Sequence, residues 1–255
     1  MYLMLQAATR AASLLSRYFD AEVAGLDCIP KGGALLVGNH NGNVVTPDSY
    51  VFAAAYYRHF GYHDPLVALA HDFVFRIPLL SDLAKNFGLL PASSDHAHAA
   101  LQRGRKVLLY PGGGWEASRP SKDRDRIDFA GRVGFLRIAM RARVPIVPVV
   151  TAGAHDGWFV LSRGDRLARA LGLKRLFRMD VFPIAIGLPT GLIVGPATPY
   201  IPLPFKMLIE VQPPITVEGN EDDRDALFRA YSDITGSMQA ALTTLASRLP
   251  GRQRK

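Results

Sequence analysis

The sequence contains a single cysteine, Cys28, among its 255 residues. One thiol excludes an internal disulfide and offers no cysteine pair to a metal, which is consistent with a reducing compartment. No histidine lies near Cys28 in the sequence, so we expect a structural thiol rather than a nucleophile. Among the seven histidines, His59 and His63 have the spacing of helical zinc ligands, but Gly61 between them ends the expected helix. We therefore predict no metal site.

Three motifs that would point to other functional classes are absent. The sequence has no Gly-x-Ser-x-Gly elbow, which disfavours a serine hydrolase. No lysine or hydroxyl residue follows the three glycines at 112–114, so this turn is not a phosphate loop of the Gly-Lys-Ser/Thr kind. No recognisable nucleic-acid-binding motif accompanies the basic composition, and we predict no nucleic-acid partner.

A long uninterrupted apolar run is also missing. The N-terminus lacks the basic start, continuous apolar core and small-residue cleavage site of a secretory signal, so we expect none. The longest uncharged stretch, residues 181–205, has the length of a membrane span but contains six prolines. A regular helix with a satisfied backbone could not form in lipid from such a stretch.

The composition favours one domain with an anionic partner. Hydrophobic residues make up 49% of the chain and the formal net charge is +8, which suits anionic lipid headgroups or a phosphorylated or CoA-type substrate. Residues 1–20 are expected to form an amphipathic helix with Arg10 and Arg17 on its polar side. This helix either packs on the domain or lies in a membrane interface. Residues 21–250 would form the domain and residues 251–255 a basic tail.

Apolar strand patterns alternate with helical patterns between residues 34 and 150. This alternation predicts an α/β fold: a single domain with a mixed, largely parallel sheet flanked by helices. Prolines at 145 and 148 restrict the strand at 144–150 to a sheet edge or a strand end. The expected strands are 21–26, 34–37, 66–70, 88–91, 106–110 and 144–150, and the expected helices after the first are 49–60, 77–87, 95–103, 135–143 and 222–249.

The turn after the strand at 34–37 carries the first candidate catalytic pair. His40 follows that strand, and Asp48 follows Pro47 at the start of a predicted helix. A carboxylate in this position could hydrogen-bond to one ring nitrogen, fix the tautomer and leave the other nitrogen free to take a proton. A satisfied histidine in a turn and an ordinary helix-start aspartate would give the same pattern.

A second polar turn follows the strand at 106–110. Gly112, Gly113 and Gly114 allow the backbone to approach a ligand and offer N–H groups to an anion, although a plain turn has the same composition. The nearby charged residues are Glu116, Arg119 and Arg132. Arginine suits phosphate because its planar fork donates two hydrogen bonds, while a solvated basic face would also place arginines here.

Taken together, these blocks resemble the glycerolipid (lysophospholipid) acyltransferase family. The resemblance rests on Gly38-Asn39-His40, on Asp48, on Tyr110-Pro111-Gly112-Gly113 with Glu116, and on residues 144–149. In that family four residues separate the histidine from the aspartate, whereas seven do here. The chain resembles the 1-acylglycerol-3-phosphate acyltransferase-like members, with features of the diacylglycerol acyltransferase-like branch. The family's third block usually reads Pro-Glu-Gly, and the form in this sequence is closer to that second branch.

The resemblance implies acyl transfer from acyl-CoA or acyl carrier protein to a lipid hydroxyl, as in phospholipid biosynthesis, with no further cofactor. It implies His40 as general base and Asp48 as the residue that orients the imidazole, both catalytic. Substrate-binding roles would fall to Asn39, to the N–H groups at 112–114, to Glu116, and, for a phosphate, to Arg119 and Arg132.

The resemblance also implies a location at the cytoplasmic face of a membrane, peripheral or monotopic. The uncharged stretch 181–205 would then line an acyl groove, touch the bilayer or pack in the core. A noncatalytic lipid-binding protein and an acyl thioesterase are the alternatives to a transferase, and the oligomeric state is open.

Overall fold

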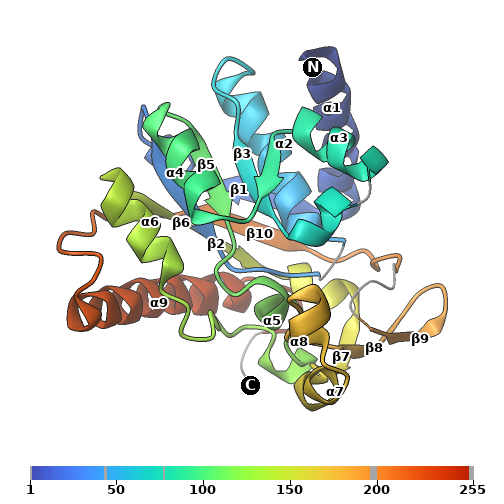
Figure 1. Cartoon of the computed structure of the whole chain (residues 1–255). Helices are drawn as coiled ribbons and strands as arrows, with labels where there is room; N and C mark the ends of the chain where they lie inside the picture. Colours follow the sequence, from blue (N-terminus) through green and yellow to red (C-terminus); the bar gives the residue numbers. More distant parts are fainter. Residues whose placement is uncertain (1, 43–44, 77, 196–199, 253–255) are drawn as a thin grey trace.

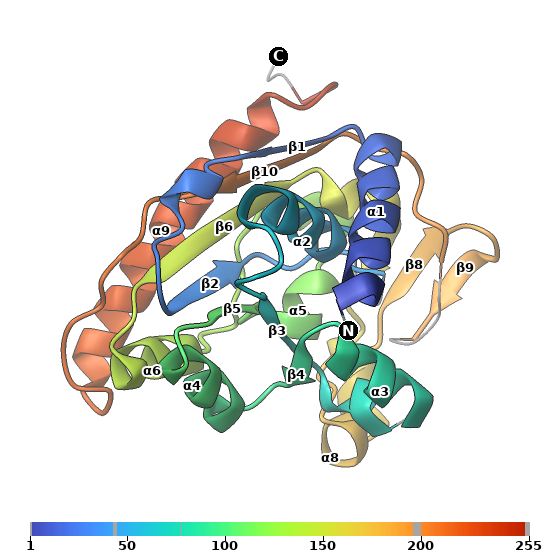
Figure 2. The same ribbon diagram turned by 90° about the horizontal axis from the view of Figure 1, so that it is seen from above.

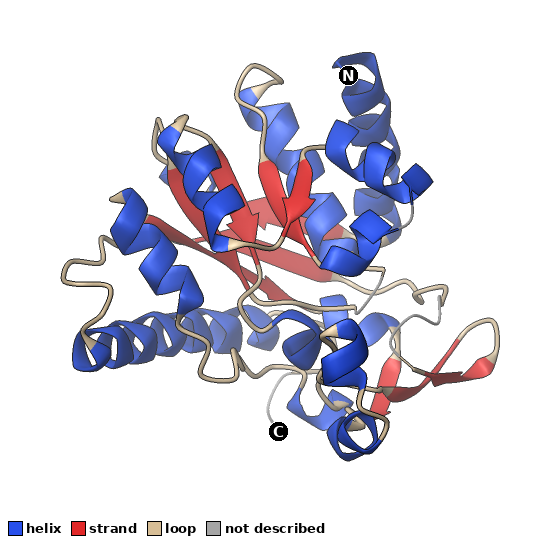
Figure 3. Cartoon of the chain, in the orientation of Figure 1, coloured by secondary structure: helices blue, strands red, loops and turns tan. Residues whose placement is uncertain are grey.

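The computed structural model of the protein describes residues 2–42, 45–76, 78–195 and 200–252. A seven-stranded sheet has helices on both faces, and a small three-stranded sheet lies at one end (Figures 1 and 3). In spatial order the large sheet consists of β1 (Ala21–Ala24), β10 (Met207–Val211), β6 (Ile146–Ala152), β2 (Ala34–Gly38), β5 (Lys106–Leu109), β3 (Val67–Ala70) and β4 (Leu89–Pro91).

Every neighbouring pair in the large sheet is parallel except β10 with β6. The predicted fold, a single α/β domain with a mixed and largely parallel sheet, is therefore confirmed. Each of the six predicted strands lies within two residues of its expected bounds. Strand β10 and the small sheet were not predicted.

Helices cover the sheet on both faces because alternate side chains of its buried strands point in opposite directions. Leu35 and Val37 of β2 pack with α4 (Ser94–Gln102), α6 (Gly134–Ala142) and α9 (Arg224–Ser247). Ala34 and Leu36 pack on the other face with α2 (Pro47–Phe60). Figures 1 and 2 show α9 on the face opposite α1 and α2.

The N-terminal helix α1 (Tyr2–Tyr18) forms as predicted and packs against α2. Its buried neighbour Phe19 joins the core, whereas Leu14 is 65% exposed. The helix therefore rests on the domain along one side and keeps apolar side chains at the surface. Across the residues that the structure describes, no helix combines the length and apolarity needed to cross a membrane. Helix α3 (Pro78–Asn86) also forms as predicted, although Ile77 lies outside the described residues.

Of the two positions predicted for the strand with two prolines, a sheet edge or a strand end, the sheet edge is wrong. Strand β6 lies inside the sheet between β10 and β2, with Pro148 opposite Val37. Pro145 precedes the strand, and the Pro148 carbonyl accepts a hydrogen bond from Gln212 N–H just beyond the last β6–β10 pair, Val149 with Val211. Because the missing N–H of Pro148 falls at the end of that ladder, an interior strand tolerates it.

Two stretches for which no helix or strand was predicted contain regular structure. Residues 113–117 form the short helix α5 (Gly113–Ala117) rather than an open turn. The uncharged stretch 181–205 contributes β8 (Ile184–Gly187) and β9 (Gly191–Val194), which pair antiparallel with β7 (Phe159–Ser162) in the small sheet. Helices α7 (Asp165–Ala170) and α8 (Leu173–Phe177) connect β7 to β8.

Candidate active site

The carboxyl ends of β2 and β5 meet at one edge of the large sheet. The two strands are parallel neighbours, and the chain leaves β2 at Gly38 and β5 at Leu109. Residues 39–42 and 110–114 therefore start side by side, at the edge where open α/β sheets bind ligands. The two polar turns identified in the sequence come together here.

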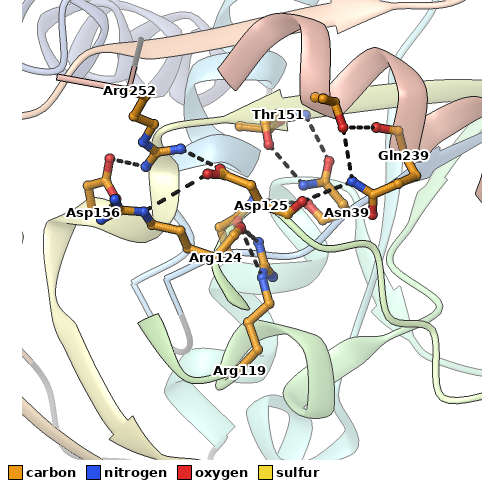
Figure 4. A network of polar contacts seen from close by, with 10 residues as sticks. Asn39, Arg119, Arg124, Asp125, Thr151, Asp156, Gln239 and Arg252 are labelled. Atoms are coloured by element: carbon orange, nitrogen blue, oxygen red, sulfur yellow. Dashed lines mark hydrogen bonds and ion pairs between the residues drawn. The ribbon is translucent and has the colours of Figure 1, made fainter. Parts of the chain in front are cut away.

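Asn39 fixes the end of β2 to β6. Its side-chain nitrogen donates to the Thr151 carbonyl at 2.9 Å and its side-chain oxygen accepts from Thr151 N–H at 2.7 Å (Figure 4). The residue is completely buried, and both of its polar atoms serve these backbone bonds. The predicted substrate contact of Asn39 is therefore wrong, and its role is to hold the strand end that carries His40.

His40 is half-buried and held through both its ring and its backbone. The imidazole stacks on Tyr110 with ring centroids 4.5 Å apart and planes inclined by 20°. Its backbone N–H donates to Glu116 Oε2 at 2.8 Å, and its carbonyl accepts from Arg119 at 2.7 Å. Burial, aided by the nearby Arg119 charge, lowers the pKa of His40 to about 4. The ring is therefore neutral near pH 7 and able to accept a proton.

The structure does not form the predicted direct hydrogen bond between His40 and Asp48. Within the described residues, His40 Nδ1 is buried and has no hydrogen-bond partner. The Asp48 carboxylate instead accepts from the backbone and side chain of Asn41, at 3.2 and 3.1 Å, and from Ser49 N–H at 2.9 Å. With seven residues between His40 and Asp48, Asn41 can bind this carboxylate. Asp48 therefore holds the turn that carries His40 through Asn41.

Glu116 belongs to the same buried network. Oε2 accepts from His40 N–H, and Oε1 accepts from Asp128 N–H at 3.1 Å. A Cβ on Gly112 would lie 2.6 Å from Glu116 Oε2, so glycine is required for this close approach. Burial raises the pKa of Glu116 to about 7 and that of Asp48 to about 6, although Arg119 acts to lower both. Because Glu116 is completely buried and its carboxylate is occupied in this way, the predicted substrate contact is wrong.

Arg119 is the centre of the network and is only 1% exposed. Its guanidinium donates to the backbone carbonyls of His40, Glu116 and Arg124 and to Asn41 Oδ1, over distances of 2.6 to 3.1 Å. Figure 4 shows the bonds to Arg124. A buried guanidinium occupied in this way cannot also bind a substrate phosphate. The predicted phosphate contact of Arg119 is therefore wrong, and the residue is a positioning residue for His40.

The network extends to the end of the described chain. Arg124 contacts Asp156 at 3.4 Å, and Arg252 pairs with both Asp125 and Asp156 (Figure 4). The Arg252 side chain is only 9% exposed. This residue is therefore not part of a frayed basic tail as predicted, and residues 253–255 lie outside the described chain.

Arg132 and the three glycines border the His40 turn. Arg132 donates to the Pro111 and Gly112 carbonyls and pairs with Asp180 at 3.1 Å, and its side chain is 39% exposed. A contact between Arg132 and a substrate phosphate stays a prediction. In the part of the chain that the structure describes, the N–H groups of Gly112 and Gly114 have no acceptor, whereas Gly113 N–H donates to Tyr110. No cluster of three or more metal-ligating side chains occurs among these residues.

Three residues of the site were missed by the sequence interpretation. Asn41 links Arg119 to Asp48, Tyr110 stacks on His40, and Ser49 donates to the Tyr110 hydroxyl at 2.9 Å. Tyr110 and Asn41 each follow a strand end beside a residue that was identified. Their positions at strand ends indicated that they lie near the site, but their side-chain contacts could not be deduced from the sequence.

Replacing Gly38 with alanine should disturb the ring stack. A Cβ at Gly38 would lie 2.5 Å from the Tyr110 ring. This ring packs against core side chains and stacks on His40, so a shift of the ring would disturb both contacts. We expect a loss of about 1–3 kcal/mol in the free energy of unfolding, typical of overpacking, together with reduced activity. Urea denaturation and activity assays would measure both. Gly134→Ala is the control, since a Cβ there meets no atom within 4 Å. Equal stability of the two variants would contradict the prediction.

Comparison with known proteins agrees with this geometry. Residues 20–152, more than half of the chain, match the family model described as Acyltransferase. A Homo sapiens protein named DGAT1/2-independent enzyme synthesizing storage lipids is 31% identical over 223 residues, which cover 87% of this chain and 64% of that protein. An uncharacterized protein of Mycobacterium tuberculosis is 31% identical over 233 residues, covering 89% of this chain and 62% of its own length. The chain thus spans less than two thirds of these relatives.

A solved structure has the same fold. The crystal structure of the 1-acyl-sn-glycerophosphate acyltransferase PlsC from Thermotoga maritima matches with a TM-score of 0.60 and 15% identity. The match covers 96% of this chain and 80% of that one. At this identity the likeness concerns the fold alone, whereas the family model covers the segment that contains His40, Asp48, Glu116 and Arg119. The chain belongs to the acyltransferase family.

Proposed function

We propose that the protein transfers a fatty acyl group from a thioester donor, acyl-CoA or acyl carrier protein, to a hydroxyl of a glycerolipid or related lipid. The observation that carries this proposal is the neutral His40 imidazole, fixed at the carboxyl edge of the sheet by Tyr110 and by two backbone hydrogen bonds. The name of the human relative, which refers to synthesis of storage lipids, supports a lipid acceptor.

In this mechanism His40 acts as the general base. The proton of the acceptor hydroxyl passes to the imidazole while the hydroxyl oxygen forms a bond to the thioester carbonyl carbon. Collapse of the tetrahedral intermediate breaks the carbon–sulfur bond, and the imidazolium returns the proton to the leaving thiolate. Asp48 contributes by holding Asn41, the residue next to His40, and its charge favours the transient imidazolium.

The glycine turn is suited to stabilise the developing oxyanion. The N–H groups of Gly112 and Gly114 have no acceptor among the described residues, and Gly112 packs against the carboxylate that binds His40 N–H. Backbone N–H groups that are already oriented lower the energy of a tetrahedral oxyanion without reorganisation. Arg132 lies beside this turn with a partly exposed guanidinium, which we assign to a phosphate of the donor or acceptor.

An apolar pocket of about 320 Å³ provides a place for the acyl chain. Its lining includes Trp158, Leu188 and Leu203, with Arg124 at its rim. Trp158 stacks on Tyr200, which donates to the Gly42 carbonyl in the His40 turn. The pocket is therefore connected to the turn that carries the base through Trp158 and Tyr200. We place the protein at the cytoplasmic face of a membrane, where α1 presents exposed apolar side chains and arginines suited to an interface.

The experiment that tests the function is thiol release from acyl-CoA by the purified protein, with a panel of lysophospholipid and neutral-lipid acceptors. Release that depends on the acceptor, with formation of the acylated lipid, is the expected result. Free fatty acid formed at the same rate with every acceptor would identify a thioesterase instead. Stoichiometric lipid binding without turnover of acyl-CoA or acyl carrier protein thioesters would identify a noncatalytic lipid-binding protein.

The pH dependence should follow the buried carboxyls rather than the imidazole. The pKa of Glu116 is raised to about 7 and that of Asp48 to about 6, while His40 stays neutral down to a pKa of about 4. Lowering the pH through these values removes the negative charges that favour the imidazolium, so we expect the transfer rate to fall below about pH 7. Glu116→Gln should remove the upper step and leave a fall near pH 6.

Initial rates measured across the pH range would test this prediction, with thermal unfolding as a check that the glutamine variant is folded. Both carboxyls have a raised pKa in the folded state, so their ionisation lowers the free energy of unfolding as the pH rises. Lowering the pH from 7 to 5 protonates them and stabilises the fold. A loss of activity in this range should therefore not result from unfolding caused by these two groups. A rate that stays constant down to about pH 4 would contradict the assignment to Glu116 and Asp48.

A further inference from the structure

The segment 159–203 carries most of the large hydrophobic side chains that are exposed in the described chain. Twelve of the seventeen such side chains lie in this segment, among them Leu176 at 61% and Leu192 at 57% exposure. Single exposed leucines need no explanation, but a concentration of this kind marks a surface that meets another apolar phase.

The small sheet is apolar on both faces. Val160, Ala185 and Ile193 lie in one row across its three strands and are buried. On the other face Phe159 lies opposite Ile186 and Ile186 opposite Leu192, and these three side chains are 49% to 57% exposed. An antiparallel sheet that meets water on one face normally has polar side chains there. We call the row Phe159, Ile186 and Leu192 the outer sheet face.

The two helices that connect β7 to β8 are rich in basic residues. Between residues 163 and 178, which include α7 and α8, the sequence has six arginines or lysines and one aspartate. Four of these cations pair with carboxylates of the protein, whereas Arg166 and Arg175 are exposed and form no ion pair with the described residues. Leu167, Leu171, Leu176 and Phe177 are exposed in the same segment. By contrast, residues 181–205 contain no charged residue. An uncharged apolar segment together with exposed arginines suits a bilayer with anionic lipids, in which charged headgroups cover an apolar interior.

We propose that the outer sheet face, together with α7 and α8, docks on a membrane that contains anionic lipids. The side chains of β8 and β9 enter the boundary between headgroups and acyl chains, and Arg166 and Arg175 meet the lipid phosphates. The inference rests on the proposed function, because a lipid acyltransferase would need such a membrane contact. Docking itself can be measured without turnover.

Side-chain contacts connect the docking surface to the active site. Beneath the outer sheet face, Trp158 stacks on Tyr200 with ring centroids 4.9 Å apart, and the Tyr200 hydroxyl donates to the Gly42 carbonyl at 3.0 Å. Val45 packs against the same cluster. Because Gly42 and Val45 belong to the segment between His40 and Asp48, contact with lipid at this surface brings the base to the membrane.

Helix α1 extends the same surface. The Tyr18 hydroxyl donates to the Pro202 carbonyl at 2.9 Å, and Phe19 stacks on Phe205 with centroids 4.5 Å apart. Figures 1 and 2 place α1 and the β8–β9 hairpin on the same side of the molecule. The exposed apolar end of α1 and the outer sheet face can therefore contact one bilayer together.

Flotation of the whole chain with vesicles tests the proposal, using phosphatidylcholine alone and phosphatidylcholine with phosphatidylglycerol. We expect the wild type to float with the anionic vesicles. The double variant Leu176→Asp/Leu192→Asp should reduce the bound fraction roughly tenfold or more, because it places charge in the apolar layer. The variant Arg166→Glu/Arg175→Glu should weaken binding to anionic vesicles by a similar factor, most strongly at low salt.

The matched control is Phe228→Asp on α9, which changes a side chain that is 69% exposed elsewhere and should leave flotation unchanged. Wild-type flotation that both double variants retain would overturn the proposal, as would a wild type that floats with neither vesicle. A wild-type dimer without lipid that Leu176→Asp/Leu192→Asp converts to a monomer would overturn it too, since the face would then be covered by a second copy.

A parallel assay separates this inference from the proposed function. Acyl transfer to a soluble short-chain acceptor needs no vesicle, so all three variants should keep the wild-type rate in that assay. Loss of flotation with unchanged soluble turnover supports the docking surface. Flotation without turnover of any acceptor would overturn the proposed function and leave the docking surface supported.

Discussion

Replacing His40 with glutamine should reduce the rate of acyl transfer by about 10²–10⁴-fold, the range typical of a lost general base. Glutamine keeps the backbone bonds to Glu116 and Arg119, because these involve the N–H and carbonyl of residue 40 rather than its ring. The variant should therefore fold and bind lipid while losing proton transfer. Thiol release with the preferred acceptor measures the effect, and vesicle flotation measures binding separately.

His63→Gln is the matched control, since His63 is exposed beyond the end of α2. The control should keep the wild-type rate and unfolding temperature. If His40→Gln retained the wild-type rate, the imidazole would not be the base, and the acceptor hydroxyl would have to be activated by another group. A similar fall in both variants would point to a general loss of folded protein.

Replacing Arg119 with alanine should cost about 3–5 kcal/mol in the free energy of unfolding. The change leaves four acceptors, two of them buried and two partly buried, without their donor and removes a positive charge close to two buried carboxyls. The acceptors are the carbonyls of His40, Glu116 and Arg124 and the side-chain oxygen of Asn41. Such a loss is a large part of the total stability of a typical domain, so we expect a low yield of the alanine variant.

Arg119→Lys keeps the charge but offers donors at one atom only, and it should cost about 1–3 kcal/mol with a lower kcat. Urea denaturation and steady-state kinetics of this variant distinguish two roles for Arg119. A loss of stability with kcat reduced indicates a positioning residue, as the structure indicates. Unchanged stability with a raised KM for a phosphorylated substrate would return Arg119 to the phosphate contact predicted from the sequence. Arg166→Lys, on the exposed side of α7, should change neither quantity.

The alternation of strands and helices was readable from the sequence because it depends on local periodicity. The predicted bounds of six strands and six helices lie within two residues of those in the structure. The position of the site was readable for a related reason: parallel strands deliver their carboxyl ends to one edge, so His40 and the glycine turn had to meet. Pro148 of β6 misled the prediction of a sheet edge because the effect of a proline depends on which ladder its missing N–H faces.

The roles of the charged residues could not be read in this way. Glu116 and Arg119 resemble ligand-binding residues in the sequence, yet their partners lie 76 and 79 residues away at His40. Whether a buried charge serves a substrate or the fold depends on whether its donors and acceptors are already occupied, and only side-chain positions decide that. The same holds for Asp48, which binds Asn41 rather than the imidazole.

The sequence by itself therefore determined the layered α/β architecture, the edge of the sheet that carries the site and the candidate base, since periodicity and strand ends are properties of short stretches of chain. The tertiary structure alone decided which polar residues hold His40 in place and which remain available to a substrate. It also decided that β7, β8 and β9 form a small sheet with an exposed apolar face, because the register between paired strands determines which side chains share a face.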